Sequence, residues 1–235
     1  MSKPSACLLA MFLILLWMPR ALAWNLSAEL VTDLPVQVGA RVDTEGPFGL
    51  RLSTSLGFMP AGYVDLINAV VVAADGYDDD TAKLVRSALK NSLVWRMHLG
   101  WRPFSNLGFY GDLGYGLVAL GGGVTAEDLI TLASGISSPI SDPTGARLYS
   151  VSSTLHMLDV ELGWQWELWA GLRLRAAVGF AGTVGAKTRV EPDSLPLLPG
   201  SVDVFSRSAE DYLDDIYTSY VFTPVISLGV GYAFF

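Results

Sequence analysis

The chain is short both of charged residues and of long apolar runs. Only 16% of its 235 residues are charged while 51% are hydrophobic, whereas about a quarter of the residues of a soluble domain carry charge. One long apolar run exists, over residues 6–17 at the N-terminus. An apolar excess without further helix-length runs is typical of a membrane β-barrel, in which lipid-facing residues alternate with interior ones.

Cysteine is nearly absent as well. The single cysteine, Cys7, lies in the N-terminal apolar run, which follows Lys3 and ends at the small-residue pattern Ala21-Leu22-Ala23. The run is shorter than the about 20 residues of a transmembrane helix, and its flanks are those of a secretory signal peptide. We therefore expect cleavage after Ala23 and a mature domain of residues 24–235, without disulfides or a thiol nucleophile.

Basic residues are also few. Loss of Lys3 and Arg20 with the signal peptide would leave 13 of the 15 basic residues against 23 acidic ones. The phosphates of a nucleic acid would repel such a chain. We therefore expect no nucleic-acid partner.

What the mature chain does contain is a repeated pattern of alternating apolar residues that ends at a glycine. It occurs at residues 35–41, 93–102, 155–164 and 224–232. Short turns at residues 44–47, 103–106 and 165–170 precede returning strands at residues 48–59, 107–118 and 172–183. Residues 25–31, followed by a tight turn at 32–35, supply an eighth strand.

Longer connections, at residues 60–90, 120–147 and 186–216, alternate with these short turns. Short turns on one side of the membrane and long loops on the other are typical of bacterial outer-membrane barrels. The sequence therefore predicts an all-β transmembrane barrel of eight antiparallel strands.

Aromatic residues gather at the predicted strand ends, where amphipathic rings prefer the membrane interface. They are Trp101, Trp164, Trp166, Trp169 and Tyr232, and the chain ends in Gly231-Tyr-Ala-Phe-Phe235. With these features the chain resembles the small eight-stranded outer-membrane proteins of the OmpA transmembrane domain and OmpX-like group. The resemblance implies a location in the outer membrane, contact with its lipid and lipopolysaccharide, and recognition of the last strand by the barrel-assembly machinery. Phe235 adds one residue to the usual register of that strand.

Alternation with period two also assigns side chains to the barrel interior. The charged residues expected there are Glu29, Arg41, Asp43, Arg51, Arg96, Arg102, Asp112, Asp159, Glu161, Arg173 and Arg175. Gln37, His98 and Gln165 fall on the same face. Side chains can fill an eight-stranded barrel, so we favour an ion-pair plug over the alternative, a hydrated passage for small solutes.

A lipid A-modifying enzyme is the third interpretation of such a barrel. Resemblance to the lipid A deacylases among these barrels would imply a His-x-Ser pair with a nearby Glu, in which the histidine activates the serine. His98 is followed by Leu99 and Gly100, and His156 by Met157 and Leu158. His156 is moreover expected to face lipid, opposite to Glu161. We predict no catalytic residue and no cofactor.

The long connections carry acidic and amphipathic segments. Asp75, Asp78, Asp79 and Asp80 could supply oxygen ligands to a weakly bound Ca²⁺ or Mg²⁺, although an exposed acidic turn is the simpler interpretation. Apolar spacing and Thr/Ser-x-x-Asp capping patterns predict short helices within residues 63–74, 81–90, 125–133 and 208–216. We expect these helices to form an external cap whose ligand the sequence leaves open.

Overall fold

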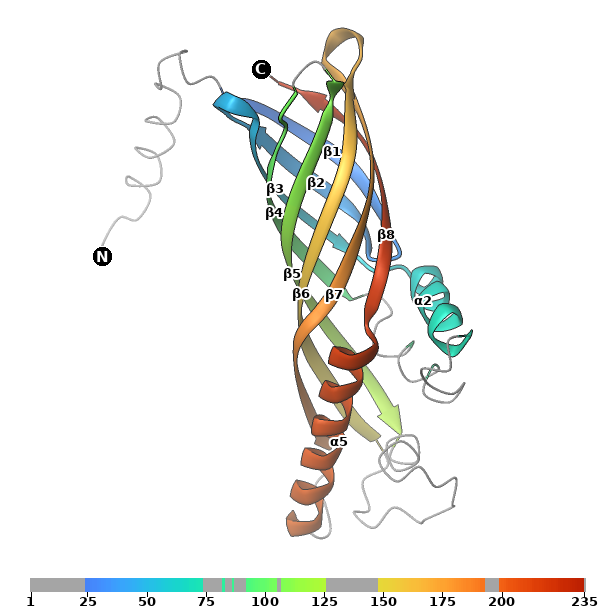
Figure 1. Ribbon diagram of the computed structural model, residues 1–235. Coiled ribbons are helices and arrows are strands. Elements are labelled where there is room, and N and C mark those ends of the chain that lie inside the picture. The colour runs from blue at the N-terminus through green and yellow to red at the C-terminus, as the bar shows by residue number, and fades with distance from the viewer. Residues whose placement is uncertain are drawn as a thin grey trace, which may run out of the picture.

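Eight strands close into a single antiparallel barrel in the computed structural model, which describes residues 24–73, 82, 86, 92–104, 107–125, 148–192 and 199–234 (Figure 1). Neighbouring strands follow the order of the sequence, and β1 pairs with β8 to close the sheet. The strands are β1 (Asn25–Leu34), β2 (Gln37–Glu45), β3 (Leu50–Phe58), β4 (Leu93–Trp101), β5 (Phe109–Thr125), β6 (Leu148–Glu167), β7 (Leu172–Pro192) and β8 (Phe222–Ala233). The predicted fold class and strand number are confirmed.

The barrel has two unlike ends. The turn end carries the short connections at residues 46–49, 102–108 and 168–171, together with both ends of the described chain (Figure 1). There the N–H of Phe234 donates to the carbonyl of Leu26 at 2.8 Å. The opposite end, the helix end, carries α2 (Ala61–Ala73) and α5 (Pro199–Tyr220). A tight turn at residues 35–36 also lies on this side.

Three strands extend well past the others at the helix end. β5, β6 and β7 have 17, 20 and 21 residues, whereas β2, β3 and β4 have nine each. The predicted loops at 120–147 and 186–216 were therefore too long. The outward residues in the extended parts of β6 and β7 are polar, as at Ser152 and Lys187. The apolar alternation therefore ends there, although the pairing of β6 with β7 continues to Pro192.

Of the two described helices, one lies where the sequence predicts it and the other begins earlier than predicted. α2 matches the apolar segment predicted within residues 63–74. The predicted start at residue 208 was wrong, because α5 begins at Pro199; proline lacks an N–H and is favoured in the first turn. Thr125 ends β5, and Ala82 and Arg86 are the helical residues described within 81–90. Residues 126–133 and Asp75, Asp78, Asp79 and Asp80 lie outside the described residues.

An apolar core closes the barrel at the helix end. Val64 and Ile67 of α2 and Leu213 and Tyr217 of α5 are buried with apolar residues from the inner wall of the barrel. The wall residues of this core are Val36, Met59, Val94, Val118, Leu120, Val151, Leu155, Met157, Ala181, Val190 and Val225. The two helices thus lie on the inward side of the extended strands. Among the described residues no helix is long and apolar enough to cross a membrane.

The outer wall of the barrel is apolar as well. Large aliphatic side chains project from it, including Leu30 and Leu113, each 70% exposed. Tryptophans gather near the turn end, at the last residues of β4 and β6 and in the turn that follows β6: Trp101, Trp164, Trp166 and Trp169. An apolar surface of this extent is unfavourable in water. With an aromatic girdle it matches the lipid-facing wall of a membrane barrel.

Candidate functional site

The interior between the apolar core and the turn end is lined by charge. All eleven charged residues predicted to point inward are at most 7% exposed. Inward-facing glycines leave room for them. A Cβ atom on Gly100 would collide with the Asp112 carboxylate, and one on Gly229 would lie 2.8 Å from Oε2 of Glu29.

Glu161 on β6 lies at the centre of these charges. Its Oε1 is 2.7 Å from Nη1 of Arg175 on β7 and 3.4 Å from Nη1 of Arg41 on β2. The Tyr110 hydroxyl donates to the same oxygen at 2.7 Å. Because β2 and β6 lie four strands apart in an eight-stranded barrel, the contact of Arg41 with Glu161 crosses the whole lumen.

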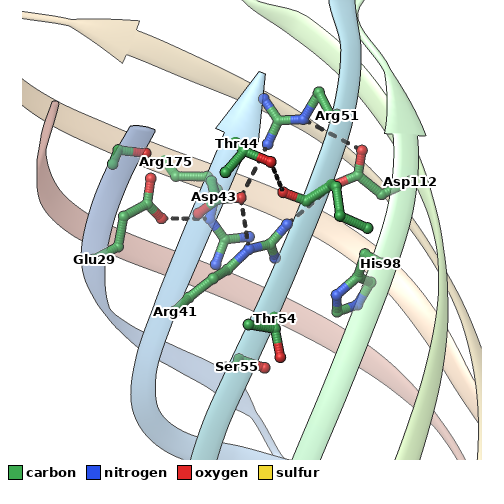
Figure 2. A network of polar contacts seen from close by, with 12 residues as sticks. Glu29, Arg41, Asp43, Thr44, Arg51, Thr54, Ser55, His98, Asp112 and Arg175 are labelled. Carbon is green, nitrogen blue, oxygen red and sulfur yellow. Dashed lines mark hydrogen bonds and ion pairs between the residues drawn. The ribbon is translucent and has the colours of Figure 1, made fainter. Parts of the chain in front are cut away.

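Arg41 joins this centre to carboxylates on two other strands. Its Nε is 2.9 Å from Oδ1 of Asp43, and its Nη2 is 3.0 Å from Oδ2 of Asp112 (Figure 2). Arg51 contacts the same two carboxylates, at 3.5 Å from Asp43 and 3.4 Å from Asp112. The guanidinium of Arg51 also lies 4.0 Å from the centre of the Tyr110 ring, a favourable cation–π distance.

A second group of contacts lies nearer the helix end. Arg96 bridges Asp33 and Asp159, each at 2.8 Å. His98 Nε2 is 2.8 Å from Oδ1 of Asp159, and Gln37 donates to Asp33 at 2.7 Å. This layer joins β1, β2, β4 and β6 directly beneath the apolar core.

Asp33 was missing from the predicted set. The pattern Thr-Asp-Leu-Pro at residues 32–35 suggested a turn, but β1 continues to Leu34. Asp33 then shares the inward face of Glu29 and Val31, is fully buried, and is paired with Arg96. Extending the period-two pattern by one step would have placed it inside.

Of the three predicted residues that remain, Glu29 lies 3.0 Å from Nε of Arg175, whereas Arg102 and Arg173 pair outside the predicted set. At the turn end Arg102 lies 2.9 Å from Glu45, and Arg173 lies 2.7 Å from Glu167. A recess of about 510 Å³ opens there, lined in part by Arg102, Glu45, Glu167 and Gln165. The charge network thus ends at an open polar mouth.

The net contribution of this network to stability is small. Each buried charge loses several kcal/mol of hydration, and attraction between paired groups offsets that loss with little net gain. Guanidinium and carboxylate groups nevertheless interlock inside the barrel, because Arg41, Arg51, Arg96 and Arg175 each contact carboxylates on two or more strands. Moving one arginine would leave its carboxylates buried without a partner, which makes the arrangement rigid.

Neither histidine is placed for nucleophilic catalysis in the described contacts. His98 contacts Asp159 inside the lumen, and Nδ1 of His156 lies 2.6 Å from the Tyr115 hydroxyl on the outward face. His156 and Glu161 therefore lie on opposite sides of β6, as predicted. Among the described residues no cluster of three or more His, Cys, Asp or Glu is placed to hold a metal.

The closed sheet, its apolar wall and its charged interior define the molecule as a small eight-stranded membrane β-barrel. No protein-family model matches the chain. No curated protein sequence matches it. In structure it is similar to a major outer membrane protein from Thermus thermophilus, with 16% identity and a TM-score of 0.47 over 90% of this chain and 100% of that one. It is also similar to Acinetobacter baumannii CarO2 (14% identity, TM-score 0.38, 89% and 98% covered) and CarO (13%, 0.39, 92% and 99%).

Proposed function

We propose that the protein is a non-enzymatic integral outer-membrane protein whose barrel is closed to solutes and presents a helical cap outside the cell. Its turn end would face the periplasm and its helix end the exterior, as short turns and long loops do in bacterial barrels. The observation that carries the proposal is the contact of Arg41 with Asp43, Asp112 and Glu161 across the lumen.

Two further features support a closed barrel. The apolar core formed by α2, α5 and the inner wall covers the lumen at the helix end. The N–H of Val190 on β7 donates to the Glu210 carboxylate of α5 at 2.8 Å, which ties the helix to the free edge of the extended strand. A structural or surface-binding role of the cap, with an external ligand, fits these contacts better than transport.

The last strand supports the proposed route into the membrane. In β8, Ile226, Leu228, Val230 and Tyr232 point outward, and Phe234 after it is also exposed. An aromatic C-terminal strand of this kind is the proposed signal to the barrel-assembly machinery. Outer-membrane lipid and lipopolysaccharide are the proposed partners of the apolar wall.

Planar-bilayer recording of the refolded protein tests the closed lumen. We expect no stable open conductance from the wild type. The Arg41→Ser/Arg175→Ser double variant should conduct, because both guanidinium groups contact Glu161 inside the lumen, whereas Arg207→Ser on the exposed side of α5 should not. A stable conductance from the wild type would contradict the proposal and favour the small-solute channel, for which the polar recess at Arg102 would be the entrance.

The enzyme alternative has its own measurement. We expect mass spectra of lipid A from cells with and without the protein to be identical. A change in acylation that depends on His156 would overturn the non-enzymatic assignment, because His156 is the histidine on the lipid-facing side, bonded to Tyr115.

A further inference from the structure

The outward face of the extended parts of β6 and β7 carries two exposed basic residues. Lys187 and Arg189 project from β7 on the side opposite to α5, and the Arg189 side chain is 68% exposed. Across the ladder they pair with Thr154 and Ser152 of β6, whose side chains are exposed on the same face. Two cations and two hydroxyls therefore share one open surface.

This face begins where the apolar wall ends. Val184 has no partner in β6, because the register shifts between His156 and Met157, and its side chain is 57% exposed. Just below it, Phe180 stacks on Phe222 with ring centres 6.4 Å apart. Apolar and aromatic residues thus give way to cations within a few residues of the same strand.

The height of the cations above the apolar wall follows from strand geometry. Lys187 lies three residues beyond Val184, about 10 Å along the strand at about 3.3 Å per residue. With a strand tilt of about 40°, this corresponds to about 8 Å along the membrane normal. The headgroup layer of a bilayer is about 5–8 Å thick on each side. Lys187 therefore lies at the outer edge of the headgroup layer, and Arg189, two residues farther along the strand, lies about 5 Å above it.

The described acids of α5 do not contact this pair. α5 covers the inward face of β6 and β7, where Val151 and Val190 are buried with Leu213. Among the described residues Arg189 has one carboxylate within reach, that of Glu191 at 4.0 Å, and Lys187 has no ion pair. Both cations are thus available to an anion that approaches from the membrane side.

We propose that Lys187 and Arg189, with Thr154 and Ser152, bind a phosphate group of an outer-leaflet lipid whose acyl chains lie on Val184, Phe180 and Phe222. Arginine and lysine are the preferred phosphate ligands in proteins, and hydroxyls complete the donor set. The inference rests on the proposed insertion of the barrel in the outer membrane. It assigns the lipid contact to one face of the barrel, on β6 and β7.

Native mass spectrometry of the purified protein in detergent tests the proposal with two probes, bisphosphorylated lipid A and its dephosphorylated form. We expect the wild type to bind the phosphorylated lipid at least about tenfold more tightly, as two charges near an anionic headgroup predict. Lys187→Ser/Arg189→Ser should abolish that difference. Lys187→Arg/Arg189→Lys should keep it, and so should Arg207→Ser on α5.

Three results would overturn the site. They are equal binding of the two lipids by the wild type, an unchanged preference in the Lys187→Ser/Arg189→Ser variant, and displacement of the lipid by inorganic pyrophosphate, which would indicate a free-phosphate site instead. An open lumen would appear as conductance and leave this preference untouched. The lipid site and the closed barrel can therefore fail separately.

Discussion

Nη1 of Arg41 on β2 lies 3.4 Å from Oε1 of Glu161 on β6, although the two strands form opposite walls of the barrel. The same guanidinium reaches Asp43 and Asp112. One arginine thus contacts carboxylates on three strands inside the lumen.

Replacement of Arg41 by methionine should destabilise the barrel strongly. Asp43, Asp112 and Glu161 would lose a partner while buried, and breaking a buried pair costs about 3–5 kcal/mol. Denaturant unfolding in detergent micelles measures the loss. Arg207→Met, on the exposed side of α5, should change the stability by less than about 0.5 kcal/mol. Equal losses of unfolding free energy in the two variants would show that Arg41 contributes no more to stability than an exposed arginine does.

A methyl group at Gly100 should be poorly tolerated. The added Cβ atom would overlap the Asp112 carboxylate, and such overpacking costs about 1–3 kcal/mol. Gly121 is the matched control, because a Cβ atom there meets nothing within 4 Å. We expect Gly121→Ala to unfold at the wild-type denaturant concentration or above it. If Gly100→Ala did the same, the close approach of Asp112 to β4 would be refuted.

The substitution Leu113→Arg should distinguish a membrane barrel from a soluble one. Leu113 projects from the apolar part of β5 and is 70% exposed, so the substitution would place a charge against lipid at a cost of about 2–4 kcal/mol. Ser150→Arg on the extended part of β6 should be nearly neutral. The measurement is the unfolding free energy in lipid vesicles. Two nearly neutral variants would indicate that water, and not lipid, surrounds the barrel.

Alkaline pH should loosen the attachment of α5. Burial, aided by the nearby Asp214 carboxylate, raises the pKa of Tyr217 to about 12, above the about 10 of a free tyrosine. As the pH rises, Tyr217 therefore loses its proton in the unfolded protein before it does so in the folded one. Its contribution to stability is complete below pH about 10 and declines towards pH 12.

A spectrophotometric titration checks this expectation. The absorbance difference between the wild type and Tyr217→Phe should contain one tyrosine that ionises well above the others. The Tyr217→Phe variant should also lack the corresponding fall in helix content with pH. A difference titration centred near pH 10 would mean that Tyr217 is accessible and that α5 does not cover the lumen as described.

Much of this architecture was predictable, because the strands of a membrane β-barrel alternate between lipid and lumen with period two. The alternation in residues 93–102 and 224–232 was sufficient to place Arg96 inward and Leu228 outward. The same rule failed where the apolar alternation ended, so the extensions of β5 and β7 were predicted as parts of loops. The turn predicted at residues 32–35 likewise kept Asp33 out of the predicted inward set, although β1 continues to Leu34.

Within the predicted strands the sequence determined which residues face inward, because side-chain direction along a strand is a local property of the backbone. It could not determine that Arg41 reaches Glu161 and Arg96 reaches Asp33, or that Arg102 and Arg173 turn to Glu45 and Glu167. The contacts of Arg41 and Arg96 depend on the closure of the whole barrel, which brings Arg41 within hydrogen-bond distance of a residue 120 positions away. Those of Arg102 and Arg173 depend on the register of the strands at the turn end. Tertiary structure likewise decided that α5 lies against the inner wall, since only the added length of β6 and β7 offers its apolar face a surface to cover.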